Sequence, residues 1–171
     1  MATTNVNSAP VYSRQLLDSP LFAALSELEF NAVCAFLERQ KVAKGSVVFR
    51  EGENGQELFI VLSGKVNAVV TQSDGTRRKV YEFGPGSFFG EMAVIEAAPR
   101  SATCTALEDC ELMVLQGLDF YRLVFEHPMI ALKLLGAIGS VMTSWLDESS
   151  SFLNDLVRWG EKARRRAVSD E

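Results

Sequence analysis

The spacing of hydrophobic positions changes twice along the chain, which divides it into a helical start, a strand-rich middle and a helical end. Ser26-Glu27-Leu28-Glu29 has the S-x-x-E form of a capping box, in which two side chains satisfy backbone N–H groups at a helix start. The apolar positions around it recur on one helical face: Leu25, Leu28, Val33, Phe36 and Leu37. The sequence therefore predicts a helix from about residue 26 that continues through Leu37.

After Gln40 the chain consists of short β-branched or aromatic runs separated by turns that contain glycine. Asp74-Gly75 between two such runs is a hairpin signal. A spacing of roughly 8–12 residues between short strands is typical of a sandwich or roll. We expect a mainly β fold, an eight-stranded antiparallel β-roll of the jelly-roll kind with flanking helices. The clearest strand candidates are residues 47–49, 58–62, 66–70, 80–83, 102–107 and 111–115.

A helical period returns after Gly117. Residues 118–126 form a short predicted helix, and His127-Pro128 mark a bend because proline disfavours helix in the residue before it. A long helix then runs from Pro128 toward Ala167. With Ser149 as a polar break, its apolar positions alternate three and four residues apart, as in a coiled coil: Leu135, Ile138, Met142, Trp145, Phe152, Leu156, Trp159 and Ala163. This pattern predicts a homodimer through the C-terminal helix, while its first half can also pack on the chain's own β-roll.

Length and these changes of pattern indicate one domain with an appendage. The 171 residues divide into a flexible tail at 1–12, a β-roll with flanking helices at 13–127 and a dimerisation or signalling helix at 128–171. A formal charge of −5 argues against a dedicated nucleic-acid binder, although one small anion remains compatible with it.

Cysteine usage and the absence of a visible signal peptide favour a cytoplasmic protein. The cysteines, Cys34, Cys104 and Cys110, are odd in number and form no CxxC pair, so we expect buried, reduced thiols. The best candidate for a membrane span, residues 129–146, contains Lys133 and is shorter than the roughly 20 residues that a span needs. A buried or dimer-forming helix is the favoured interpretation, with no membrane contact.

Residues 88–103 carry the candidate chemistry. Gly90 precedes a short predicted helix at 91–95, and free backbone N–H groups at a helix start favour an anion. Arg100 can direct two N–H donors at a phosphate. Glu91 is a carboxylate and is therefore unsuited to be a second phosphate ligand, but it can accept a hydrogen bond from a sugar hydroxyl beside that phosphate. These residue types indicate one anion and one hydroxyl held together.

F-G-E-M-A at 89–93 and P-R-S-A-T at 99–103 resemble the phosphate-binding cassette of the cyclic-nucleotide-binding domain family. That family includes the catabolite activator protein and the regulatory subunits of protein kinase A. The resemblance extends over about residues 18–150, with F-R-E-G-E at 49–53, L-F-I-V-L-S-G-K-V at 58–66 and F-G-P-G-S-F-F-G-E at 83–91.

The resemblance implies a role for each matching position. Arg100 would pair with the cyclic phosphate and Glu91 with the ribose 2′-hydroxyl. Gly90 would let the ligand approach the backbone. The remaining predicted ligand-binding residues are the backbone amides of Met92, Ala93, Ser101 and Ala102, and the base-lining Val80, Tyr81 and Ala68.

The choice between cyclic AMP and cyclic GMP rests on weaker signals. In the family a hydroxyl directly after the arginine can bond a guanine amino group, and Ser101 supplies one, yet the AMP-binding catabolite activator also has serine there. The long helix would close over the base, with Asp147 as an acceptor for the adenine amine. We favour cyclic AMP.

The sequence lacks the residues and segments that other classes of function need. His127 is the only histidine, so a metal site or a histidine-based triad is not expected, and we predict neither catalysis nor a metal cofactor. The resemblance does not extend to a helix-turn-helix, so direct nucleic-acid binding is not expected either. The prediction is a sensor that relays nucleotide binding to a partner or downstream effector domain. The alternatives are a ligand-free dimerisation module, or the sensor part of a transcription regulator.

Overall fold

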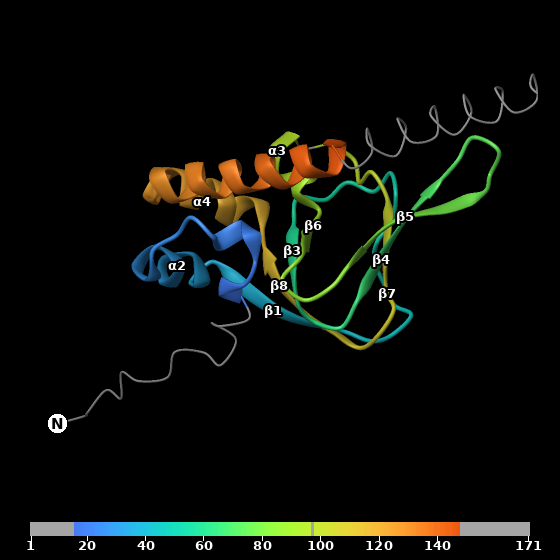
Figure 1. Ribbon diagram of the computed structural model, residues 1–171, viewed down its shortest axis with the longest axis horizontal. Coiled ribbons are helices and arrows are strands. Elements are labelled where there is room, and N and C mark those ends of the chain that lie inside the picture. The colour runs from blue at the N-terminus through green and yellow to red at the C-terminus, as the bar shows by residue number, and fades with distance from the viewer. Residues whose placement is uncertain (1–15, 97, 148–171) are drawn as a thin grey trace, which may run out of the picture. The chain divides into compact units, whose positions relative to one another are not determined.

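The computed structural model describes residues 16–96 and 98–147. The chain separates into two compact units, Met1–Ala137 and Ile138–Glu171. The described part of the first unit contains the β-roll and its helices (Figure 1). The predicted tail at 1–12 and the helix beyond Asp147 lie outside the described residues, as do Ser149, Phe152, Leu156, Trp159 and Ala163 of the predicted seam.

The predicted capping box is confirmed at the start of α2 (Glu27–Cys34), which follows the short 3₁₀ helix η1 (Pro20–Phe22). The Ser26 hydroxyl accepts from the Glu29 N–H at 3.4 Å, and the Glu29 carboxylate accepts from the Ser26 N–H at 2.8 Å. The ring of Phe22 meets that of Phe30 edge-on at 5.4 Å. These contacts fix the N-terminal helices to each other.

The predicted extension of this helix through Leu37 is wrong, because α2 ends at Cys34 and Leu37 begins strand β1 (Leu37–Val42). Strand β1 pairs antiparallel with β8 (Cys110–Leu115). Its L-E-R-Q-K-V sequence carries little β signal, since the strand lies at a sheet edge and four of its residues are exposed. Arg39 and Lys41 instead form cross-strand ion pairs with Glu111.

Within the described residues, eight strands in two antiparallel sheets confirm the predicted β-roll (Figure 1). One sheet has the order β1-β8-β3-β6, and the other has the order β2-β7-β4-β5. The remaining strands are β2 (Val47–Phe49), β3 (Leu58–Ser63), β4 (Val66–Thr71), β5 (Arg77–Phe83), β6 (Phe88–Phe89) and β7 (Thr103–Ala106). Helix α3 (Glu91–Glu96) lies between β6 and β7, as predicted.

Aromatic side chains form the core near α3. Phe59 and Phe89 stack with ring centroids 5.2 Å apart, Phe83 lies 5.0 Å from Phe89, and Phe49 lies 5.7 Å from Phe59. Burying a phenylalanine contributes about 1.5–3 kcal/mol. These ring contacts join β2, β3, β5 and β6 in one aromatic cluster.

The hairpin of β4 and β5 projects away from the rest of the first unit (Figure 1). Asp74-Gly75 forms its turn as predicted, with Gly75 at a φ of 80° and the Gln72 N–H donating to the Thr76 carbonyl at 2.8 Å. The register shifts between Ala68–Tyr81 and Val69–Lys79, so Val80 is an extra residue on β5. Such a β-bulge re-aims side chains locally.

The C-terminal elements begin with α4 (Gly117–Glu126), followed by the predicted bend at His127. The last helix runs over Pro128–Asp147 within the described residues. In the first unit, Ile130, Ala131 and Leu134 are buried and Lys133 bonds Glu29, so the start of this helix packs on its own domain. The seam residue Leu135 is 37% exposed.

Pro128–Asp147 is, by length and composition, the one described helix that could cross a membrane. The core helix of a soluble protein meets the same criterion, so a location in the cytoplasm stays a prediction. The cysteines are free thiols, with Cys104 and Cys110 buried and Cys34 half-buried. Burial raises the pKa of Cys104 to about 12.

Candidate functional site

Arg100 is fixed by its main chain to the loop between β2 and β3. Its N–H donates to the Glu53 carbonyl at 2.9 Å, and its carbonyl accepts from the Gly52 N–H at 2.8 Å. Pro99 before it carries no N–H donor. The residue is 5% exposed, so a full positive charge lies inside the domain. A buried charge is tolerated only where it is paired and hydrogen-bonded.

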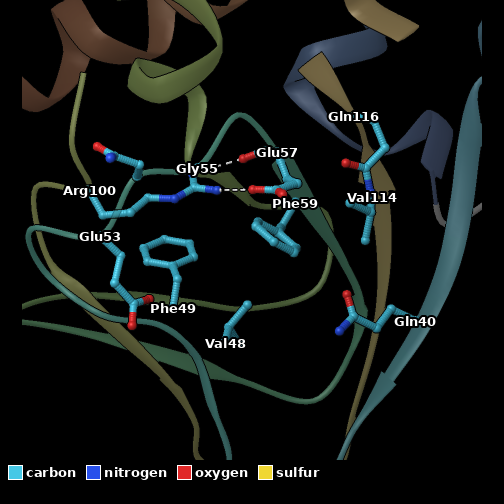
Figure 2. Close-up of a pocket in the computed structure, with 11 residues that line it drawn as sticks. Gln40, Val48, Phe49, Glu53, Gly55, Glu57, Phe59, Arg100, Val114 and Gln116 are labelled. Atoms are coloured by element: carbon cyan, nitrogen blue, oxygen red, sulfur yellow. Dashed lines mark hydrogen bonds and ion pairs between the residues drawn. The ribbon is translucent and has the colours of Figure 1, made fainter. Parts of the chain in front are cut away.

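The guanidinium of Arg100 is held on several sides (Figure 2). Nη1 donates to the carbonyls of Glu57 at 2.9 Å and Gly90 at 3.2 Å, and Nη2 donates to the Glu57 carboxylate at 2.6 Å. The Phe49 ring centroid lies 4.2 Å from Cζ, a cation–π contact. Within the described residues Nε has no hydrogen-bond partner although it is buried. One donor of a fixed arginine therefore remains available for an acceptor.

Two glycines leave room for this arrangement. A Cβ on Gly90 would lie 2.7 Å from Nη1 of Arg100 and 2.8 Å from the Glu57 carbonyl, and Gly90 has a φ of 83°. A Cβ on Gly55 would lie 2.7 Å from Nη2 and 2.8 Å from Nε. Side chains at either position would collide with the guanidinium.

Glu91, the first residue of α3, is 6% exposed. Burial raises the pKa of its carboxyl, an effect that the positive charge of Arg100 partly opposes. A buried carboxyl that lacks full compensation is a candidate acceptor for a ligand hydroxyl.

The predicted base-lining residues lie on neighbouring strands. Ala68 on β4 is 4% exposed and pairs across the sheet with Tyr81 on β5. Val80 is 51% exposed and Tyr81 39% exposed, and the Tyr81 ring packs on Phe83 at 4.8 Å. Val80 and Tyr81 are therefore exposed side chains at the bulge of β5, opposite the buried Ala68 of β4.

For the remaining predicted residues the structure gives the exposure of the side chain or the unit in which the residue lies. Met92 and Ser101 are exposed and Ala102 is buried, whereas nothing is described of the Ala93 side chain. Asp147 lies in the second unit, so its predicted contact with the base remains a prediction. The structure brings together Gly90 and Arg100 by a hydrogen bond, with Glu91 next in sequence.

Sequence reasoning missed Phe49, Gly55 and Glu57 as parts of the site. A cavity of about 310 Å³ adjoins them (Figure 2). The F-R-E-G-E turn at 49–53 marked this loop without showing that it pairs with Arg100. The cavity is lined by Gln40, Val48, Phe49, Glu53, Asn54, Gly55, Glu57, Phe59, Arg100, Val114 and Gln116.

The family model for the cyclic nucleotide-binding domain matches residues 39–127. The chain belongs to this family. It is 36% identical over 113 residues to the cyclic AMP receptor protein of Thermus thermophilus, covering 66% of this chain and 52% of that protein. The chain thus spans about half the length of this relative. Among the described residues no group of three or more histidine, cysteine, aspartate and glutamate side chains is arranged to hold a metal.

Solved structures agree with this assignment. A cyclic nucleotide-binding domain from Methylobacillus flagellatus superposes with a TM-score of 0.76 at 25% identity, covering 81% of this chain and 80% of that one. The regulatory domain of Toxoplasma gondii protein kinase A, crystallised with cAMP, gives a TM-score of 0.60 at 37% identity, covering 65% and 42%. The β-roll is therefore the shared fold, and the chain is a member of a family of regulatory, nucleotide-binding domains.

Proposed function

We propose that this chain is a cyclic AMP sensor in which Arg100 binds the cyclic phosphate. The observation that carries the proposal is the buried guanidinium of Arg100, which Glu57 and Gly90 hold in place while Nε keeps an unused donor. A cyclic nucleotide carries one negative charge, which one arginine and nearby backbone N–H groups can neutralise. The name of the Thermus thermophilus relative and the cAMP in the Toxoplasma gondii complex support this ligand class.

The ribose and base are assigned to neighbouring groups. Glu91 accepts from the 2′-hydroxyl, while Gly90 and the backbone amides of Met92, Ala93, Ser101 and Ala102 complete the anion site. The base lies over Val80 and Tyr81 beside Ala68. Their exposure supports this part of the proposal, because the uncovered apolar area is available to a stacking ring.

Cyclic AMP is preferred to cyclic GMP in this proposal, with Asp147 as acceptor for the adenine amine. The output is a relay, in which the C-terminal helix transmits nucleotide binding to a second copy and to a downstream effector domain in the cytoplasm. The chain itself is assigned no catalysis, no metal and no nucleic-acid contact. Nucleotide binding shifts the states of the helix only by its differential affinity for them.

Calorimetric titration of nucleotide-free protein with cyclic AMP and cyclic GMP tests the ligand. We expect binding of cyclic AMP to weaken by about tenfold or more in Arg100→Lys, which keeps the charge but loses the planar fork of donors. Arg39→Lys is the matched control, because Arg39 is half-exposed and pairs with Glu111 on the roll's edge. No heat with either nucleotide from folded protein would leave a ligand-free dimerisation module.

Sedimentation analysis with and without cyclic AMP tests the relay. We expect a dimer that Trp159→Ala weakens, because Trp159 lies in the predicted seam. A monomer at high micromolar concentration in both conditions would overturn the dimer part of the proposal and leave nucleotide binding intact.

A further inference from the structure

The edge of the β2-β7-β4-β5 sheet is open along β5. This strand spans Arg77–Phe83, and β4 is its only neighbour in the sheet order of the described residues. Its first five residues are exposed, and the hairpin that contains it projects from the first unit (Figure 1). An edge strand presents a row of backbone N–H and C=O groups to which a further strand can pair.

Three cations line this edge, and two of them, Arg77 and Arg78, form no ion pair with a described carboxylate. Arg77, Arg78 and Lys79 follow one another at its start and are exposed. Lys79 bonds Glu82 at 2.5 Å, and Asp74 is engaged by Thr76, whereas no described carboxylate forms an ion pair with Arg77 or Arg78. The chain as a whole carries a charge of −5, so this hairpin is a local positive area on an acidic protein.

The opposite sheet provides a comparison. Strand β1 is also an exposed edge, but its cations Arg39 and Lys41 both pair with Glu111 on the adjacent strand β8. Both cations of β1 therefore share one acidic partner within the sheet. The positive charge of Arg77 and Arg78 remains available to another molecule.

The cations of β5 decide which kind of strand can pair with its open edge. A second copy of β5 added in parallel would bring Arg77, Arg78 and Lys79 of two chains together, and like charges on adjacent strands are destabilising. Consecutive side chains of a strand point to opposite faces, so Arg77 and Lys79 share one face and Arg78 lies on the other. An added strand with carboxylates at alternate positions would place them opposite two of these cations.

We propose that the free edge of β5 binds an extended, acidic segment of a partner protein as an additional strand. Backbone hydrogen bonds supply affinity, and the cations at 77–79 select acidic side chains. The edge of β5 is open in the structure, and its binding of a partner strand does not rest on the proposed nucleotide site. It is continuous with Val80 and Tyr81, so an added strand lies next to the proposed position of the base.

Fluorescence anisotropy of the full chain with labelled peptides tests the proposal. The probe is a peptide of about nine residues with alternating glutamate and threonine, enough to span the edge. Two comparison peptides replace glutamate with lysine or carry N-methyl groups on alternate residues, which removes the donors that a strand needs. The protein variants are Arg77→Glu with Arg78→Glu, and the matched control Lys41→Glu with Lys44→Glu, which makes the same charge change near the β1 edge.

We expect the acidic peptide to bind the wild type and the control variant, and to bind Arg77→Glu/Arg78→Glu about tenfold more weakly or worse. N-methylation should weaken binding by a similar factor, and the lysine peptide should not bind. Equal binding of the N-methylated peptide would show charge attraction without strand addition and overturn the proposal. So would absence of binding, or binding only to a single-stranded oligonucleotide or anionic vesicles offered in parallel.

Discussion

Glu57 holds Arg100 through two different groups, its carbonyl at 2.9 Å from Nη1 and its carboxylate at 2.6 Å from Nη2. The carbonyl fixes the direction of the guanidinium, and the carboxylate neutralises its charge. Arg100 is 3% exposed by its side chain and Glu57 36%, so the pair lies at the boundary between core and solvent. Glu57 therefore orients the guanidinium of Arg100 and also reduces the positive potential that an anion beside it would meet.

Glu57→Gln separates these two effects. The carbonyl remains to orient Arg100, while the loss of negative charge leaves the buried guanidinium without its counter-ion. We expect the free protein to lose about 1–2 kcal/mol of unfolding free energy, a value reduced by the solvent that screens Glu57. Cyclic AMP should bind several-fold more tightly and raise the melting temperature by more than in the wild type. Thermal melts with and without nucleotide measure both quantities.

Glu53→Gln is the control for this experiment, since Glu53 lines the same cavity but pairs with Arg50. Its melting temperature and its response to nucleotide should stay close to those of the wild type. If Glu57→Gln behaved like Glu53→Gln, the ion pair with Arg100 would have no role in the site.

Gly55→Ala tests whether the guanidinium of Arg100 needs the space that Gly55 leaves by having no side chain. The new methyl group would lie 2.7 Å from Nη2 of Arg100, which must then move from Glu57. We expect a loss of stability of about 1–3 kcal/mol and cyclic AMP binding weakened by about tenfold. Gly84→Ala is a matched control, because neither glycine has a positive φ and a Cβ at Gly84 meets no atom within 4 Å. Denaturant unfolding and calorimetry of both variants decide the result.

The sequence predicted the roll, the cassette and the bend at His127 because each depends on local signals. Short β-branched or aromatic runs predicted most of the strands, and Asp74-Gly75 predicted the position of the hairpin turn. Strand β1 escaped prediction because its stability comes from pairing with β8, more than 60 residues away. A polar edge strand has no local pattern that distinguishes it from a helix end.

The contacts that hold Arg100 could not be predicted for the same reason, because they join residues that are far apart in the sequence. Glu57 and Arg100 are separated by 43 positions, and Phe49 lies further still, so only the folded chain shows their contact. The cassette residues Gly90, Glu91 and Arg100 were found because they lie within one short segment. The residues that hold Arg100 come from another segment, since Phe49 ends β2 and Glu57 lies in the loop that follows it.

Glu91→Gln should raise the stability of the free protein and lower its selectivity for the ribose 2′-hydroxyl. Burial raises the pKa of Glu91, because the charged carboxylate costs more free energy in the folded protein than in water, and a neutral amide should therefore raise the melting temperature. If Glu91 accepts from the ribose, the variant should bind cyclic AMP about tenfold more weakly and lose most discrimination against 2′-deoxy cyclic AMP. Calorimetry with both nucleotides on both proteins gives the coupling energy. A variant that still rejected the deoxy analogue as strongly as the wild type would show that another group reads the hydroxyl.

The contact between Glu29 and Lys133 should make stability depend on pH in a defined window. The Lys133 ammonium lies 2.7 Å from both Glu29 oxygens, and it is the first cause, before Ser26, that lowers the pKa of Glu29 from 4.5 to about 2. An acid with a depressed pKa stabilises the folded state above its unfolded pKa, and this contribution fades as pH falls toward the folded pKa. The difference in unfolding free energy between wild type and Glu29→Gln should therefore be constant above about pH 5.5 and shrink progressively below about pH 4.5.

Lys133→Met identifies the origin of that pH dependence. Without the ammonium, only Ser26 lowers the pKa of Glu29, so adding Glu29→Gln should change stability less, and over a narrower range of pH. Urea unfolding of all four proteins at several pH values gives the comparison. Equal effects of Glu29→Gln with and without Lys133 would assign the stabilisation to the capping box alone, and the last helix would then owe its attachment to the buried Ile130, Ala131 and Leu134.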